Sequence, residues 1–109
     1  MTIDCGRKSL GCWADKPSRA VGGGIRFHSN KVVEDCEKYA HERGFAVFAV
    51  QYGKECFTAA DAEDTYQKYG ESEACEDGKG GSWALDVYSA DTCRRKERSN
   101  FIRYLRLTN

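Results

Sequence analysis

The chain has 109 residues, with 17 basic and 17 acidic side chains and a hydrophobic share of 40%. This length predicts a single domain over residues 1–109, and the hydrophobic share is sufficient for a core. The zero formal charge excludes a global attraction to nucleic acid or to a membrane surface. No stretch approaches the roughly 20 apolar residues of a membrane span, so no transmembrane segment is expected.

Six cysteines are spread almost evenly along the chain: Cys5, Cys12, Cys36, Cys56, Cys75 and Cys93. An even number at wide spacing in a small chain predicts a disulfide framework, and hence a secreted protein. The spacing is too wide for the ligand pairs of a structural zinc site, so no metal and no cofactor is expected. The first residues carry no hydrophobic signal core, so a secretion signal is expected to have been removed.

The first part of the chain predicts two short strands and a helix. Residues 10–14 and 25–27 have the composition of short extended segments. Apolar residues at helical spacing predict a helix over 31–43. Asn30 is suited to cap its N-terminus, and Gly44 is suited to the left-handed position after its end.

The middle of the chain predicts a buried strand, a returning strand and a second helix. The apolar run 45–52 is typical of a strand that is buried on both faces. Residues 55–57 follow a turn signal and predict the returning strand. Thr58 would cap a helix over 59–69, whose first turn is acidic.

The last part of the chain alternates in polarity. Residues 82–88 predict a half-buried strand, with Trp83, Leu85 and Val87 on one face. Residues 101–107 contain β-prone side chains and arginines, and predict an edge strand.

Several segments together resemble the WSC domain. They are Leu10-Gly-Cys-Trp-Ala-Asp15, Arg19-Ala20, Val33-Glu-Asp-Cys36, Gly44-Phe45, Phe48, Gln51-Tyr-Gly-Lys-Glu-Cys56 and Val87-Tyr88. The resemblance covers residues 10–88, and the stretch Gly80 to Tyr88 is similar to a branch found in secreted proteins of marine invertebrates. It implies an extracellular, disulfide-stapled module associated with carbohydrate binding. It also implies a small α+β fold with a helix packed on a short antiparallel sheet, similar to PAN modules. With the two helices that the sequence pattern predicts, the expected fold class is α+β, two helices packed on a short, mainly antiparallel sheet.

The chain departs from the family pattern at two positions where WSC domains carry further cysteines. Those positions are Ala40 and Thr58 in this chain. The resemblance therefore implies three disulfides: Cys36–Cys56, Cys12–Cys75, and Cys5–Cys93 closing the two ends. From the residues alone, the other possible connectivities stay open.

No enzyme is predicted. His28 and His41 lack the context of a nucleophile triad. Adjacent carboxylates on one helix do not form the separated pair of a glycosidase. The acidic stretches at 61–64 and 71–77 do not have the spacing of a calcium-binding loop.

The first hypothesis is a lectin-like binding module. Sugar sites combine an apolar platform with a few placed polar groups. The candidates are Trp13, Arg19, Gln51, Tyr52, Lys54, Trp83, Asp86 and Tyr88. Gln51 and Tyr52 are expected to be exposed where a strand meets a turn, whereas their strand positions favour the core for Trp13 and Trp83.

The alternative hypothesis is a protein-interaction, matrix, defence or signalling module. A basic segment, residues 94–107, would bind an acidic extracellular protein or a sulfated glycan. Its basic side chains are Arg94, Arg95, Lys96, Arg98, Arg103 and Arg106. Such binding would weaken as salt rises, whereas binding of a neutral sugar would not.

Overall fold

The computed structural model describes residues 7–90. The predicted Cys5–Cys93 disulfide, the basic segment 94–107 and the predicted strand 101–107 lie outside these described residues.

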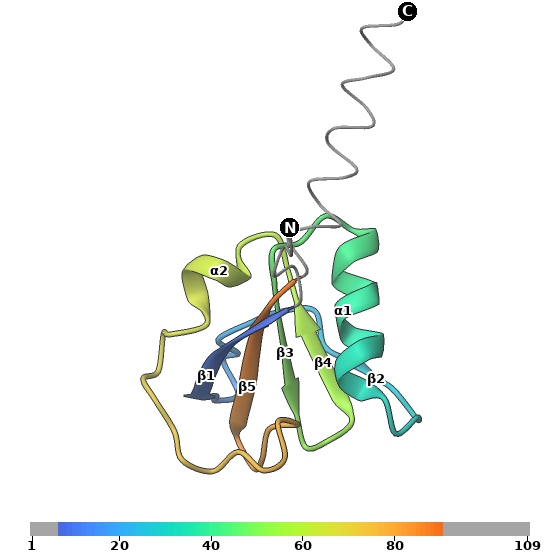
Figure 1. Cartoon of the computed structure of the whole chain (residues 1–109). Helices are drawn as coiled ribbons and strands as arrows, with labels where there is room; N and C mark the ends of the chain where they lie inside the picture. The colour runs from blue at the N-terminus through green and yellow to red at the C-terminus, as the bar shows by residue number, and fades with distance from the viewer. Residues whose placement is uncertain (1–6, 91–109) are drawn as a thin grey trace, which may run out of the picture.

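Five strands form one antiparallel sheet in the order β1-β5-β3-β4-β2 (Figure 1). The strands are β1 (Lys8–Ala14), β2 (Ile25–Arg26), β3 (Val47–Gln51), β4 (Glu55–Thr58) and β5 (Ala84–Ser89). Strand β3 lies in the middle of the sheet, between β5 and β4, and every one of its residues is buried. This agrees with the prediction from its apolar run, which is typical of a strand buried on both faces. The predicted α+β class with a mainly antiparallel sheet is therefore confirmed.

Helix α1 (Val32–Glu42) covers one face of the sheet. Its buried stripe of Val32, Val33, Cys36 and Ala40 packs against Phe48, Val50 and Cys56. The prediction that Asn30 caps this helix is wrong. The N-cap residue is Lys31, and the hydroxyl of Ser29 accepts the hydrogen bond from its amide at 3.1 Å. The helix ends as predicted, since Gly44 follows it with a φ of 74°.

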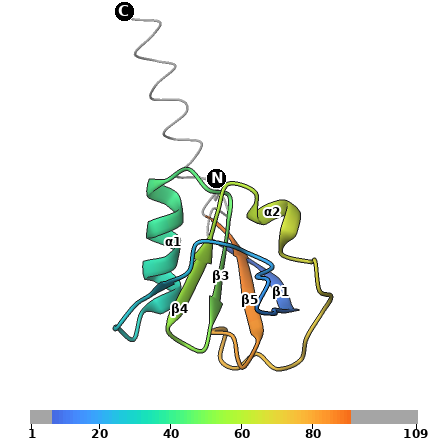
Figure 2. The same cartoon turned by 180° about the vertical axis from the view of Figure 1, so that it is seen from behind.

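The other face of the sheet is covered by irregular backbone and a single helical turn. Figure 2 shows the segment between β1 and β2 crossing over the sheet, and this segment buries Ala20 and Val21. The turn is α2 (Ala62–Thr65). The longer helix predicted over 59–69 is wrong in its extent. Ala62, Tyr66 and Tyr69 do pack against the core. After Thr65, however, the amides of Lys68 and Gly70 bond to carbonyls three residues back rather than four, so the chain continues as turns.

Thr58 does not cap α2. It is the last residue of β4, and its hydroxyl donates to the carbonyl of Val47 at 2.7 Å. The residue is buried, so this bond satisfies a hydroxyl that water does not reach.

Two disulfides join the layers. Cys36–Cys56 connects α1 to β4, and Cys12–Cys75 connects β1 to the loop before β5. They are the pairs that the resemblance implies within the described residues. The second bridge spans 63 positions of sequence, so it holds a long loop against the sheet.

Candidate functional site

Two large apolar side chains are exposed at one end of the sheet. Tyr52 directly follows β3 and is 49% exposed, and Trp83 directly precedes β5 and is 42% exposed. No other large hydrophobic side chain of residues 7–90 is as exposed. Strands β3 and β5 are antiparallel neighbours, with Val50 opposite Asp86. The residue after β3 and the residue before β5 therefore lie at the same end of the sheet (Figure 1).

Both aromatic residues have a left-handed backbone conformation. Tyr52 has a φ of 57° and is followed by Gly53 at 68°, in a turn closed by a 3.3 Å hydrogen bond from the Lys54 amide to the Gln51 carbonyl. Trp83 has a φ of 53° and occupies the third position of the turn 81–84. Glycine or asparagine normally occupies such positions, because a bulky side chain is strained there. Strain of this kind concentrates at functional sites, so these two turns identify a candidate site.

A buried polar network lies beside Trp83. Asp15 is 4% exposed, and its carboxylate accepts from Arg19 Nη1 at 2.7 Å and from the Ala20 amide at 2.9 Å. In the amide orientation that satisfies both of its polar atoms, Gln51 donates to Asp15 at 3.0 Å and accepts from Arg19 at 3.3 Å. The network therefore holds the Arg19 side chain in one position.

Arg19 connects this network to the aromatic rings of Trp83 and Phe57. Its guanidinium carbon lies 5.0 Å from the centre of the Trp83 ring and 5.1 Å from that of the Phe57 ring. A cation at this distance over a ring is attracted by the ring's quadrupole. The Asp15 amide also donates to the Trp83 carbonyl at 2.9 Å, so both the ring and the backbone of Trp83 are held.

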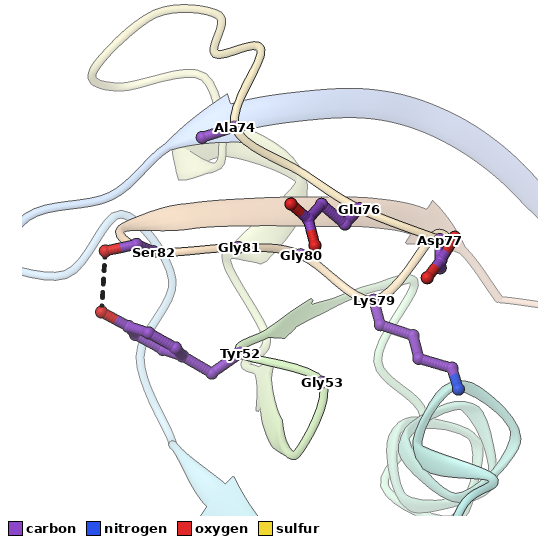
Figure 3. Close-up of a pocket in the computed structure, with 9 residues that line it drawn as sticks. All are labelled: Tyr52, Gly53, Ala74, Glu76, Asp77, Lys79, Gly80, Gly81 and Ser82. Carbon is purple, nitrogen blue, oxygen red and sulfur yellow. Dashed lines mark hydrogen bonds between the residues drawn. The ribbon is translucent and has the colours of Figure 1, made fainter.

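A hollow of about 450 Å³ adjoins Tyr52 (Figure 3). The Tyr52 and Ser82 hydroxyls are 3.0 Å apart and close one side of it. The charged side chains around the hollow are Glu76, Asp77 and Lys79. The hollow therefore offers an aromatic ring, hydroxyls and charged groups within one concave surface.

Gly80 brings the loop before β5 close to the sheet. A Cβ at this position would lie 2.2 Å from the Val50 carbonyl oxygen, and the residue has a φ of 75°. Its amide donates to the Asp86 carboxylate at 2.8 Å. Asp86 therefore helps to hold this loop against the sheet.

The model of the WSC domain family matches residues 9–82. This chain belongs to the WSC domain family. WSC domains are generally extracellular modules of the carbohydrate-binding type, and the family is non-catalytic. Membership and the disulfides both point to an extracellular location. The comparison with curated proteins finds no match to this chain.

The WSC domain brings Arg19 and Trp83 into contact, and Tyr52 lies at the same end of the sheet, hydrogen-bonded to Ser82, the residue before Trp83. The expectation that Trp83 belongs to the core is wrong, because it lies in a turn rather than in β5. The expectation that Gln51 is exposed is also wrong. Gln51 is 1% exposed, since β3 directs it to the same face as Ala49, against Asp15. Lys54 is exposed in the hairpin turn beside Tyr52.

Trp13 and Tyr88 lie away from the aromatic pair. Trp13 is half-buried against the core, its ring meeting that of Tyr66 edge-on at 5.4 Å and its indole donating to the Leu10 carbonyl. Tyr88 stacks on Phe48 at 5.4 Å, and its hydroxyl donates to the Gly78 carbonyl. Burial raises the pKa of Tyr88, and the nearby Asp86 charge raises it further while Arg7 opposes this. Both rings serve packing.

Sequence reasoning missed the roles of Asp15 and Ser82. In the sequence, Asp15 belongs to a family motif, and its charge, opposite to that of Arg19 four residues later, is the local signal that predicts the ion pair. Nothing local indicates that Ser82 meets Tyr52, because 30 positions of sequence separate the two. Such pairs are decided by strand pairing.

Two further findings concern what the described part of the chain lacks. Within residues 7–90, no cluster of three or more His, Cys, Asp or Glu side chains has the arrangement of a metal site. Neither helix in this range is long and apolar enough to cross a membrane.

Proposed function

We propose that this WSC domain is a lectin-like module that binds carbohydrate at the surface formed by Tyr52, Trp83 and Arg19. The observation that supports it best is the pair of exposed aromatic residues held in strained, left-handed turns. An exposed ring provides an apolar face for the C–H groups of a sugar. The fixed guanidinium provides hydrogen-bond donors beside that face.

The secreted localisation and the absence of catalysis belong to the same proposal. Membership of the WSC domain family supports a secreted and non-catalytic protein, because WSC domains are generally extracellular, non-catalytic modules. The disulfides support secretion, because such bonds persist in oxidising compartments.

The test is a glycan-array screen of the oxidised protein at low and at physiological salt, followed by titration of the hits. We expect hits on uncharged sugars that persist at the higher salt. Trp83→Asn and Tyr52→Asn should each weaken binding about 10-fold, corresponding to loss of an aromatic contact. Asparagine is chosen because it tolerates the left-handed backbone.

The matched control is Tyr39→Ala, which removes an aromatic ring from α1 on the opposite face of the sheet. It should bind as the wild type does. The proposal is wrong if both asparagine variants fold and bind unchanged. Hits confined to sulfated glycans at low salt would contradict it and favour the alternative hypothesis of the basic segment 94–107.

A further inference from the structure

A second hollow, of about 360 Å³, lies beside β2 and β4. Its lining is Arg19, Gly24, Ile25, Arg26, Glu55 and Phe57. It thus combines one aromatic ring, two guanidinium groups and one carboxylate in a concave surface, which is the mixture that a polar, hydroxyl-rich ligand requires.

The charges of this hollow cancel in pairs. Arg19 is paired with Asp15 at 2.7 Å, and Arg26 is paired with Glu55 at 3.4 Å. Neither guanidinium therefore leaves an unbalanced positive charge for an anion. Within residues 7–90, the hydrogen bonds of Arg19 use Nη1, so its Nε and Nη2 groups remain as donors. This arrangement favours hydroxyl groups over carboxylates or sulfates.

The Glu55 carboxylate has unused acceptor capacity. Its Oε1 is shielded from solvent and receives no hydrogen bond from the described residues. Its Oε2 receives one long bond from Arg26, whose side chain is 61% exposed. Because the terminal torsion of glutamate is soft, the carboxylate can turn Oε1 toward a donor in the hollow. A buried acceptor without a donor is unfavourable, so an incoming hydroxyl would relieve this cost.

The Arg19 side chain connects the second hollow to the exposed ring of Trp83. The Arg19 guanidinium contacts the ring of Phe57, which lines the hollow, and the ring of Trp83, which lies at the exposed surface. A ligand that covers Trp83 therefore reaches the hollow across Arg19.

We propose that the hollow containing Glu55 and Arg26 is a second sugar subsite, so that the ligand is an uncharged oligosaccharide chain rather than one terminal sugar. This inference rests on the proposed function. Trp83 contacts one sugar unit, and Glu55 and Arg26 bind hydroxyl groups of a neighbouring unit.

The experiment measures affinity by calorimetry for uncharged gluco-, manno- and galacto-oligosaccharides, from the monosaccharide to the hexasaccharide, and for uronate counterparts. For the wild type we expect affinity to rise with chain length and to be higher for the uncharged series. Glu55→Gln keeps the side-chain shape and should lower tetrasaccharide affinity roughly 10-fold, as for a lost charged hydrogen bond. It should leave monosaccharide affinity unchanged. Arg26→Gln should act in the same direction.

Glu63→Gln, on the exposed surface of α2, is the control and should change neither affinity. The inference is overturned if wild-type affinity is independent of chain length, if the uronates bind better, or if Glu55→Gln leaves tetrasaccharide affinity unchanged. If Trp83→Asn still weakens binding in those cases, the proposed function stands alone. If the wild type binds no member of either series, both are wrong.

Discussion

Replacing Tyr52 by asparagine is expected to stabilise the domain while weakening its binding. Tyr52 and Gly53 both have positive φ values, the combination of a type I′ turn. Asn-Gly is the favoured pair in such turns, whereas a bulky L-residue in this conformation costs about 1–2 kcal/mol. The variant also loses the exposed hydrogen bond to Ser82, worth roughly 0.5 kcal/mol. The net gain in unfolding free energy is therefore about 0.5–1.5 kcal/mol.

The assay is thermal unfolding of the oxidised protein followed by circular dichroism, with urea unfolding as a second measure. A gain of this size corresponds to a rise in Tm of roughly 2–9 °C for a domain of this length. Lys54→Asn is the control at the last position of the turn, where φ is not positive, and should stay within about 0.5 kcal/mol of the wild type. Gly53→Ala should lower stability by about 1–2 kcal/mol, because alanine is strained at a φ of 68°. A Tyr52→Asn protein that is less stable than the wild type would refute the strain argument.

Three other predictions concern the support of the site and the core. Gln51→Leu removes a buried partner of Asp15 and should lower the free energy of unfolding, measured in urea, by about 1–3 kcal/mol. Binding should also weaken, because Arg19 loses its fixed position. Unchanged stability would contradict the role of the Asp15–Arg19–Gln51 network. Replacing Cys36 and Cys56 together by serine should lower the unfolding free energy by roughly 3 kcal/mol, and a loss below about 1 kcal/mol would contradict the role of this bridge. Because burial raises the pKa of Tyr88, its neutral form contributes stability that is present below pH 10.0 and is lost as pH rises through its folded pKa. Tyr88→Phe should therefore lose stability less steeply above pH 10.0 than the wild type, and parallel pH curves would contradict this.

The fold was predictable where local pattern and tertiary environment agree. Helix α1 has apolar residues at helical spacing, and Gly44 follows it in the left-handed conformation that ends a helix. Strand β3 is apolar throughout and is the buried centre of the sheet. The chain between β4 and β5 was predicted poorly, because it is mostly polar and its shape depends on the Cys12–Cys75 bridge. The expected helix there is a single helical turn followed by further turns, although Ala62, Tyr66 and Tyr69 pack against the core as a helical spacing would.

The candidate site was likewise predictable in part from the sequence and in part decided by tertiary contacts. From the sequence by itself, the number and spacing of the cysteines predicted a disulfide framework, and the family motifs identified the WSC domain, with its α+β class and the Cys36–Cys56 and Cys12–Cys75 pairs. Tyr52, Trp83 and Arg19 were among the candidate binding residues chosen by residue type. Only the tertiary structure decided that Trp83 is outside and Gln51 inside. The turn 81–84 takes Trp83 out of the alternation that its neighbours follow. The alternation along β3 places Gln51 on the same face as Ala49, where it meets Asp15. The physical reason is that exposure depends on which segments meet across the sheet, and those contacts join residues far apart in the sequence.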